Sequence, residues 1–173
     1  IKQCTKGVDT IFHTAALKHV VMCERDPIES IQSNILGVNN IINASVENNV
    51  KKVIFTSSDK AVNPINLYGA TKLAAEKLCI AANNIVGKKK IFFSAVRYGN
   101  VIGSRGSIIE IFNRIKQSGK NNFPVTHKDM TRFWITINQG IELVNHAFND
   151  MKGGEIYVPK IPSIKITDLA KAM

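Results

Sequence analysis

Apolar residues fall into two kinds of segment along this chain. Short apolar or β-branched runs occupy 8–15, 51–58 and 90–98, and each ends in small or polar residues. Between them, 27–49 and 67–85 carry apolar residues at every third or fourth position, which is typical of an amphipathic helix. Strands that alternate with helices of this length predict right-handed βαβ units and a parallel sheet with helices on its faces.

The pattern changes after about residue 119. A helix is predicted at 108–117 and another at 138–150. Short strand candidates lie between them, at 124–127 and 133–137, and after the second helix, at 155–159. We therefore predict an α/β protein. Residues 1–119 form the C-terminal part of a Rossmann-like, doubly wound dinucleotide-binding domain, and 120–173 begin a smaller substrate-binding region with returning sheet elements.

One element of a dinucleotide-binding sheet is absent from the sequence. Such a sheet carries a glycine-rich turn, G-x-G-x-x-G, after its first strand, and no such turn occurs in these 173 residues. We expect the chain to be a fragment of a longer protein that lacks the N-terminal, glycine-rich half of the sheet and the C-terminal end.

Composition narrows the class of protein. Hydrophobic content of 45% and charged content of 21% are those of a globular protein. Cys4, Cys23 and Cys79 are scattered, which argues against a disulfide framework or a zinc site and for a reducing compartment. No apolar run approaches the roughly 20 residues of a membrane helix. We expect a cytoplasmic protein with no metal and no membrane span.

The net charge of +10 raises the question of nucleic acid. The basic residues are spread along the chain without interleaved aromatics, and 88–90 is their only run. This pattern favours a solvated, lysine-rich surface and no nucleic-acid partner, although part of the excess could face a small polyanionic ligand.

The candidate chemistry lies where predicted strands end, because ligands of open parallel sheets bind beyond the carboxyl ends of the strands. The densest stretch is SSDKAVNPINLYGATK, residues 57–72. Tyr68 and Lys72 are one helical turn apart, and a nearby ammonium lowers the pKa of a phenol, which can then take a proton from an alcohol. Asp59 and Lys60 form either an acid/base pair or an ordinary surface ion pair.

Several strings together resemble one known family: HTAALKHV, SNILG, SSDKAVNPINLYGATK, RYGNVIGSRGS and MTRFWIT. They are similar to the extended short-chain dehydrogenase/reductase family, and within it to UDP-N-acetylglucosamine 4,6-dehydratases of the inverting kind that begins pseudaminic acid synthesis, with a CapD-like polysaccharide biosynthesis domain. The resemblance runs from about residue 9 to residue 173.

The resemblance implies a reaction and a role for five residues. Bound NADP, rather than NAD, oxidises carbon 4 of the sugar, water leaves across carbons 5 and 6, and the hydride returns to carbon 6. Tyr68 would be the base on the 4-hydroxyl, Lys72 would lower its pKa and hold the nicotinamide ribose, and Ser58 would bond the same oxygen. Asp59 would protonate the departing 6-hydroxyl. Lys60 would be the base at carbon 5, where relatives that retain configuration usually carry glutamate.

The resemblance also implies two sets of binding residues in a homo-oligomeric enzyme. The cofactor would contact Thr14, Ala15, Ala16, Lys18, Thr56, Ser57, Tyr68, Lys72 and Val101. The UDP-sugar would contact Lys18, Asn100, Arg105, Gly106, Ser107, Thr126 and Arg132. Asn34, inside the first long helix, is expected to have a structural role in bonding nearby backbone.

Three alternatives remain open from the sequence. A dehydratase of the retaining kind would share almost every motif. A nucleotide-sugar 4-epimerase or reductase on the same fold would have no need of the Asp59–Lys60 pair. A non-catalytic dinucleotide-binding regulator would have no need of Ser58, Tyr68 and Lys72 together.

Overall fold

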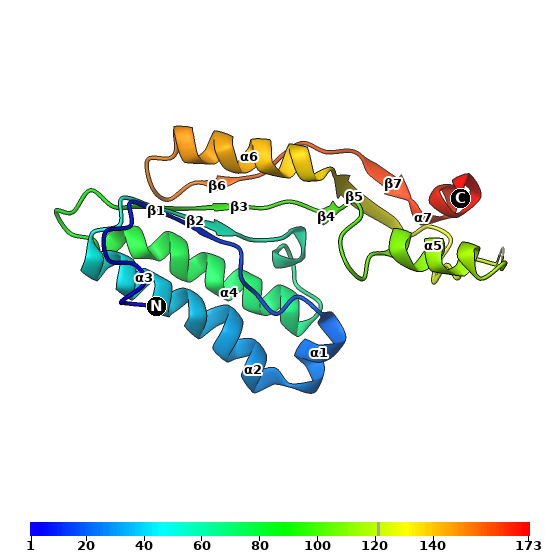
Figure 1. The fold of residues 1–173 in the computed structure, drawn as a ribbon, viewed down its shortest axis with the longest axis horizontal. Helices are drawn as coiled ribbons and strands as arrows, with labels where there is room; N and C mark the ends of the chain where they lie inside the picture. The colour runs from blue at the N-terminus through cyan, green and yellow to red at the C-terminus, as the bar shows by residue number, and fades with distance from the viewer. Residues whose placement is uncertain (121) are drawn as a thin grey trace. The chain divides into compact units, whose positions relative to one another are not determined.

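The structure, a computed structural model, describes residues 1–120 and 122–173 (Figure 1). It contains two compact units that alternate along the chain. Unit 1 comprises Ile1–Arg97 and Leu143–Val158, and unit 2 comprises Tyr98–Glu142 and Pro159–Met173. No boundary between the two units falls at residue 119. The division into a dinucleotide-binding part, 1–119, and a substrate-binding part, 120–173, stays a prediction.

Unit 1 is built on a four-stranded parallel sheet. Its order is β1-β2-β3-β6, formed by Thr10–His13, Lys52–Thr56, Phe92–Val96 and Ile156–Tyr157. The register pairs His13 with Phe55 and Thr56 with Val96. The carboxyl ends of β1, β2 and β3 therefore lie along one edge of the sheet, as predicted for a Rossmann-like α/β fold.

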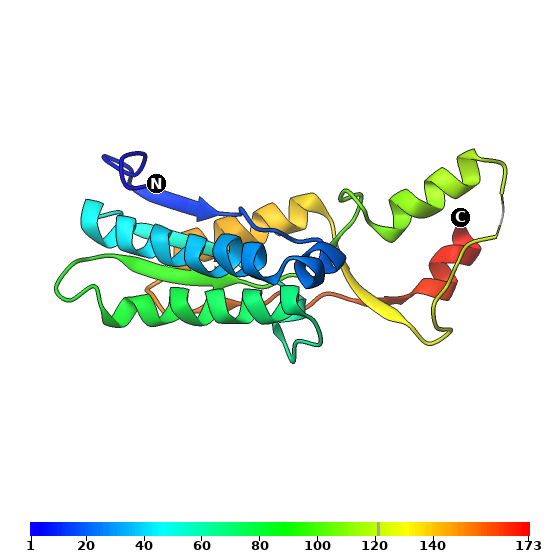
Figure 2. The ribbon, with the colours of Figure 1, turned by 90° about the horizontal axis from the view of Figure 1, so that it is seen from below.

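Helices cover both faces of this sheet (Figures 1 and 2). α3 (Gly37–Asn48) and α4 (Leu67–Ala81) lie on one face, and the unit 1 part of α6 (Ile137–Asp150) lies on the other. On that second face, the Lys52 ammonium donates to the Phe148 carbonyl at 2.6 Å, and the rings of Phe12 and Phe148 are 5.7 Å apart. The prediction of a doubly wound sheet is confirmed.

The core explains why these segments became central strands. In β2 and β3 every residue after the first is buried, as expected for parallel strands that are covered on both faces. Between the sheet and the first helical face, the core contains these buried side chains: Val38, Ile42, Val53, Phe55, Ala75, Cys79, Phe93 and Ala95.

The helix expected over 27–49 is not a regular α-helix. It consists of α2 (Pro27–Ile31), a π-helical segment (Gln32–Leu36) and α3. Asn49, which follows the last residue of α3, adopts the left-handed conformation and ends the helix. α1 (Val20–Arg25) precedes it and was not predicted, since six residues are too few to show a period. α4 ends at Ala81 rather than at residue 85, and a 3₁₀ turn (Ala82–Asn84) follows.

The described residues of unit 2 form a small sheet, two complete helices and the first part of α6. β5 (Thr131–Ile135) pairs in parallel with β4 (Asn100–Val101) and antiparallel with β7 (Ser163–Lys165). α5 (Ile108–Gln117) buries Phe112, whose ring lies 4.7 Å from that of Phe123, and α7 (Ile166–Ala172) follows β7. The strand predicted at 124–127 is wrong: this segment is irregular, and Pro124 has no N–H for a ladder.

Candidate active site

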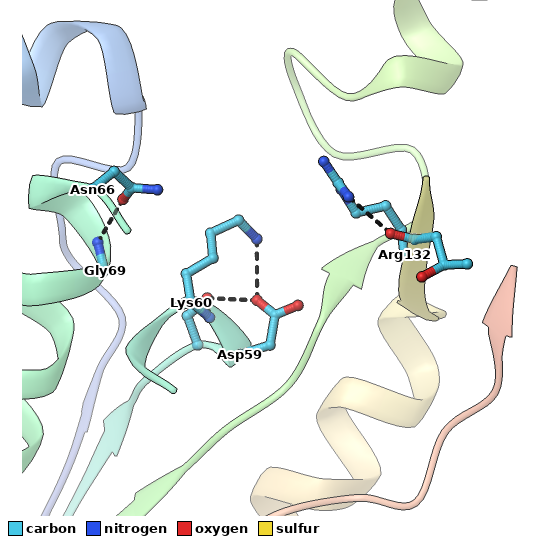
Figure 3. Close-up of polar contacts among 7 residues, drawn as sticks. Asp59, Lys60, Asn66, Gly69 and Arg132 are labelled. Carbon is cyan, nitrogen blue, oxygen red and sulfur yellow. Dashed lines mark hydrogen bonds and ion pairs between the residues drawn. The ribbon is translucent and has the colours of Figure 1, made fainter. Parts of the chain in front are cut away.

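The start of α4 is fixed by two side-chain caps. The Asn66 Oδ1 accepts a hydrogen bond from the Gly69 N–H at 2.9 Å (Figure 3). A carboxylate oxygen of Glu24, on α1, accepts one from the Leu67 N–H at 2.8 Å. Pro64 keeps the preceding residues out of the helix. Tyr68 therefore lies in the first turn of α4, half-buried, and Lys72 lies one turn further on.

Lys72 is buried in a position where charge is costly. Its side chain packs 4.7 Å from the centre of the Phe55 ring, and its Nζ donates to the carbonyl of Thr56, at the end of β2, at 2.8 Å. Burial lowers the pKa of Lys72 to about 8, because the interior disfavours the charged form. The amine thus titrates close to neutral pH.

Ser58, Asp59 and Lys60 form one hydrogen-bonded group directly after β2. The Lys60 Nζ and the Ser58 hydroxyl both donate to Asp59 Oδ1 at 3.1 Å, and the Lys60 N–H donates to the Ser58 oxygen at 3.3 Å (Figure 3). The last bond caps a 3₁₀ turn, η2 (Asp59–Ala61). Side-chain exposure of 28% for Asp59 and 36% for Lys60 leaves the pair partly sheltered from water.

Turn η2 and helix α4 approach each other with no side chain between them. A Cβ placed on Gly69 would lie 2.3 Å from the Lys60 carbonyl oxygen and 3.0 Å from the Pro64 Cβ. The absence of a side chain at Gly69 therefore lets the turn that carries Asp59 and Lys60 pack on the first helical turn, which carries Tyr68. Unit 1 therefore contains all five predicted catalytic residues: Ser58 as the cap of η2, Asp59 and Lys60 within η2, and Tyr68 and Lys72 on α4.

The carboxyl ends of β1 and β2 offer buried polar atoms with no partner among the described residues: His13 Nε2 and Ser57 Oγ. Desolvation, and secondarily the charge of Lys72, lowers the pKa of His13. Thr56 donates its hydroxyl to the His13 carbonyl at 3.1 Å and so links the two strand ends. Orphaned buried polar groups next to strand ends suit a polar ligand such as a dinucleotide.

The segment after β1 contains four of the predicted cofactor residues, Thr14, Ala15, Ala16 and Lys18, and it is held by Asn34. The Asn34 amide accepts from the Leu17 N–H at 2.7 Å and donates to the Leu17 carbonyl at 2.9 Å. It also donates to the Thr71 hydroxyl at 3.0 Å, and Thr71 donates to the Tyr68 carbonyl at 2.8 Å. The structural role expected for Asn34 is confirmed, and the network joins the segment after β1 to the first turn of α4.

One charged pair near the site was missed by sequence reasoning. Glu76, one turn after Lys72 on α4, has a fully buried side chain and accepts two hydrogen bonds from Arg97, of which the one from Nε measures 2.7 Å. Arg97 directly follows β3. The spacing of Tyr68, Lys72 and Glu76, four residues each, was the signal in the sequence that this face of α4 is polar.

The remaining predicted residues lie in unit 2. Asn100 and Val101 form β4 and pair with Trp134 and Ile135. Arg105, Gly106 and Ser107 precede α5, and Thr126 and Arg132 are exposed, before and within β5. Arg132 donates to the Thr131 carbonyl at 2.8 Å (Figure 3). Their role in binding substrate stays a prediction.

The start of α5, where Gly106 and Ser107 are expected to contact the UDP-sugar, is already capped by side chains of the chain itself. The Ser107 oxygen accepts from the Glu110 N–H at 3.5 Å, and Glu110 accepts from the Gly106 N–H at 2.5 Å, which lowers the pKa of its carboxyl. Ser107-x-x-Glu110 is a capping pattern that the sequence already displayed. A diphosphate at this helix terminus would have to displace the Glu110 carboxylate.

The described residues contain neither a cluster of metal ligands nor a helix that could span a membrane. Within 1–120 and 122–173, no group of three or more His, Cys, Asp or Glu residues could hold a metal ion. Over the same residues, every helix is too short or too polar to cross a membrane.

Comparison with known proteins identifies the family. Residues 1–173 match the family described as "Polysaccharide biosynthesis protein". The chain belongs to this family. The membership confirms the resemblance drawn from the motifs.

Two curated relatives carry different enzyme names. The UDP-N-acetylglucosamine 4,6-dehydratase (inverting) of Campylobacter jejuni subsp. jejuni serotype O:2 is 53% identical over 97% of this chain and 50% of its own length. A UDP-glucose 4-epimerase of Rickettsia akari is 44% identical over 100% of this chain and 50% of its own length. The chain thus spans about half the length of the curated relatives it matches.

A solved structure shows the same fold at low sequence identity. The dTDP-glucose 4,6-dehydratase DesIV from Streptomyces venezuelae, with NAD and TYD bound, has a TM-score of 0.88 and 19% identity. The match covers 99% of this chain and 58% of that one. This chain therefore has the same fold as the part of that protein that it matches.

Proposed function

We propose that the full-length protein removes water across carbons 5 and 6 of UDP-N-acetylglucosamine, inverts carbon 5 and releases UDP-2-acetamido-2,6-dideoxy-L-arabino-hex-4-ulose. One observation carries this proposal: the Asp59–Lys60 pair lies on a turn that packs directly on the helical turn bearing Tyr68. Groups for moving a hydride and groups for eliminating water are thereby gathered in one unit. The 53% identity to an inverting dehydratase supports the same assignment.

The oxidation half of the reaction falls to Tyr68, Lys72 and Ser58. The Tyr68 phenolate takes the proton of the 4-hydroxyl while the hydride leaves the same carbon. Lys72 supplies a positive charge one helical turn away, which favours the phenolate. Ser58, whose side chain caps η2, would bond the 4-oxygen.

The elimination half falls to the pair on η2. The Lys60 amine accepts the proton of carbon 5, which the 4-ketone has made acidic, and Asp59 gives a proton to the 6-oxygen as the carbon–oxygen bond breaks and water leaves. The two side chains are in direct hydrogen-bond contact at 3.1 Å. The proton gained by Lys60 can therefore pass to Asp59 and restore that pair. Once carbon 6 has received its hydride, carbon 5 takes a proton from solvent on the opposite face, and Tyr68 releases the proton of the 4-hydroxyl to solvent, which restores every group for the next turnover.

A nicotinamide dinucleotide, which we propose to be NADP, supplies a reversible acceptor for the hydride when bound. Thr14, Ala15, Ala16 and Lys18 would line it after β1, Thr56 and Ser57 after β2, and Tyr68, Lys72 and Val101 would complete the contacts. The orphaned Ser57 hydroxyl and His13 nitrogen support a polar ligand at these strand ends.

The proposal extends to the rest of the substrate and to the setting. Lys18, Asn100, Arg105, Gly106, Ser107, Thr126 and Arg132 would contact the UDP-sugar. We expect the enzyme to be a homo-oligomer of the cytoplasm that feeds pseudaminic acid synthesis and flagellin glycosylation, and residues 120–173 to begin its substrate-binding region.

Proton NMR of the full-length protein turning over UDP-N-acetylglucosamine in deuterated water tests the reaction. We expect deuterium at carbon 5 and ring couplings of the L-arabino configuration. Lys60→Ala should lose product formation by at least about 100-fold, whereas Lys77→Ala, exposed on α4, should not change it. A Lys60→Ala enzyme that eliminates water at the wild-type rate would contradict the assigned base.

The main competing function is a nucleotide-sugar 4-epimerase, which the Rickettsia akari relative favours. An epimerase returns the hydride to carbon 4, and needs neither Asp59 nor Lys60 for chemistry. Epimerised sugar without loss of water in the same NMR experiment would establish this alternative. A product with the D-xylo configuration would instead indicate a retaining dehydratase, and dinucleotide binding without turnover would indicate a regulator.

A further inference from the structure

Gly69 lies at the closest approach between the two functional elements of the site. A Cβ at this position would be 2.3 Å from the Lys60 carbonyl oxygen, 3.2 Å from the Lys60 carbonyl carbon and 3.0 Å from the Pro64 Cβ. These are backbone and proline-ring atoms, which cannot rotate aside as the end of a long side chain can. Since ordinary contact with a Cβ begins at 3.4 Å, a methyl group here requires a separation of about 1 Å more.

The two elements are not equally free to move. Helix α4 is anchored by its Asn66 cap, by the bond from Lys72 to Thr56 and by the buried pair of Glu76 and Arg97. Turn η2 contains 3 residues, and its first N–H bond is closed by the Ser58 side chain, which accepts from the Lys60 N–H. A group inserted between them therefore displaces the turn, while the helix stays in place.

We propose that Gly69 is a positioning residue that sets the distance between the redox group, Tyr68, and the elimination pair, Asp59 and Lys60. The inference rests on the proposed function, because only a dehydratase uses both sets on one sugar. Carbon 4 and carbons 5 and 6 are held by the same bound ring, so moving η2 withdraws the acid and the base from a substrate that remains aligned with Tyr68. A misplacement of about 1 Å is enough to slow a reaction step by about 100-fold.

The test compares Gly69→Ala with Gly140→Ala in the full-length protein. Gly140 also lies in the first turns of a helix, α6, and a Cβ there would meet nothing within 4 Å. Two steps are followed after UDP-N-acetylglucosamine is added to enzyme loaded with oxidised cofactor: reduction of the nicotinamide, by stopped-flow absorbance, and formation of dehydrated sugar, by NMR.

For Gly69→Ala we expect dehydration to fall by about 100-fold. Nicotinamide reduction should stay within about threefold of wild type, so that reduced cofactor accumulates before water is lost. Gly140→Ala should match wild type in both steps. Equal loss of both steps in Gly69→Ala would overturn the inference, because it would mean that the methyl group disturbs Tyr68 as well. Dehydration at the wild-type rate would overturn it too.

If Gly69→Ala does not fold, as judged by circular dichroism, Ala61→Gly replaces it. This variant loosens η2 by removing a buried methyl group and cannot create a clash. The same division between the two steps is expected, and its absence refutes the role of the contact. A wild-type enzyme that yields no dehydrated sugar refutes the proposed function itself and with it this inference. If the wild-type enzyme forms dehydrated sugar and the Gly69→Ala variant forms it at the same rate, only the role of Gly69 is refuted.

Discussion

Replacing Lys72 with methionine should stabilise the protein while it abolishes catalysis. Lys72 is buried, and its pKa falls from 10.5 to about 8 because its charged form is desolvated. Since one pKa unit corresponds to about 1.4 kcal/mol, folding with a charged Lys72 costs about 3 kcal/mol at pH 7. Methionine has a similar length and carries no charge.

Part of this gain is offset by a lost hydrogen bond. The Lys72 Nζ donates to the Thr56 carbonyl, and such a bond contributes about 1 kcal/mol net. Lys72→Met should therefore raise the free energy of unfolding by about 2 kcal/mol at pH 7. Between about pH 8 and 10.5 the unfolded chain binds more protons than the folded one, so the wild type gains stability with rising pH and the advantage of methionine disappears by about pH 10.5.

Urea denaturation of the full-length protein, freed of nucleotide, at pH 7 and pH 10 measures both effects. Lys77→Met, exposed on the same helix, is the matched control and should change stability by less than about 0.5 kcal/mol at either pH. The reasoning fails if Lys72→Met is less stable than wild type at pH 7, or if its difference from wild type is the same at both pH values.

Two further predictions concern buried groups. Glu76→Gln removes the carboxylate partner of Arg97 and should lower the free energy of unfolding by about 3 kcal/mol. The control is Glu47→Gln, at the half-exposed pair with Lys2, which should lower the free energy of unfolding by less than about 1 kcal/mol. Equal losses in urea denaturation would count against a buried ion pair. Burial raises the pKa of the Cys79 thiol to about 12. Iodoacetamide at pH 8 should therefore alkylate exposed Cys4 and leave Cys79 unmodified until the protein unfolds, which peptide mass spectrometry measures. Equal labelling of the two cysteines in the native protein would contradict this prediction.

Long periodic segments of the fold were predictable from the sequence, and short ones were not. The central strands and helices α4, α5 and α6 show clear apolar spacing, because each buries one or two faces against the sheet or its neighbours. β4 and β7 contain two and three residues, and α1 contains six, which is too short for a period to be visible. The π-helical segment has no local signature, since its packing against α4 and the bond from Asn34 to Leu17 are tertiary contacts.

In the candidate site, too, local features were predictable from the sequence and tertiary contacts were not. Ser58, Asp59 and Lys60 could be placed at a strand end, and Tyr68 and Lys72 on one helix, because strand ends and helical spacing are local properties. The pairing of Glu76 with Arg97 depends on how α4 lies against β3, and the contact of Gly69 with Lys60 depends on how the chain returns after Pro64. Neither is encoded in a spacing. The cap by Glu110 was readable and was overlooked.

The chain passes between its two compact units at residues 97–98, 142–143 and 158–159. A hybrid protein made with a relative through a single crossover in this part of the chain would therefore contain at least one unit of mixed parentage. Exchange of unit 2 as a whole requires two inserts transferred together, and one of the joins would fall within helix α6. Recombination of whole modules is thus a poor route to new specificity on this scaffold, and substitutions within a unit are the more accessible one.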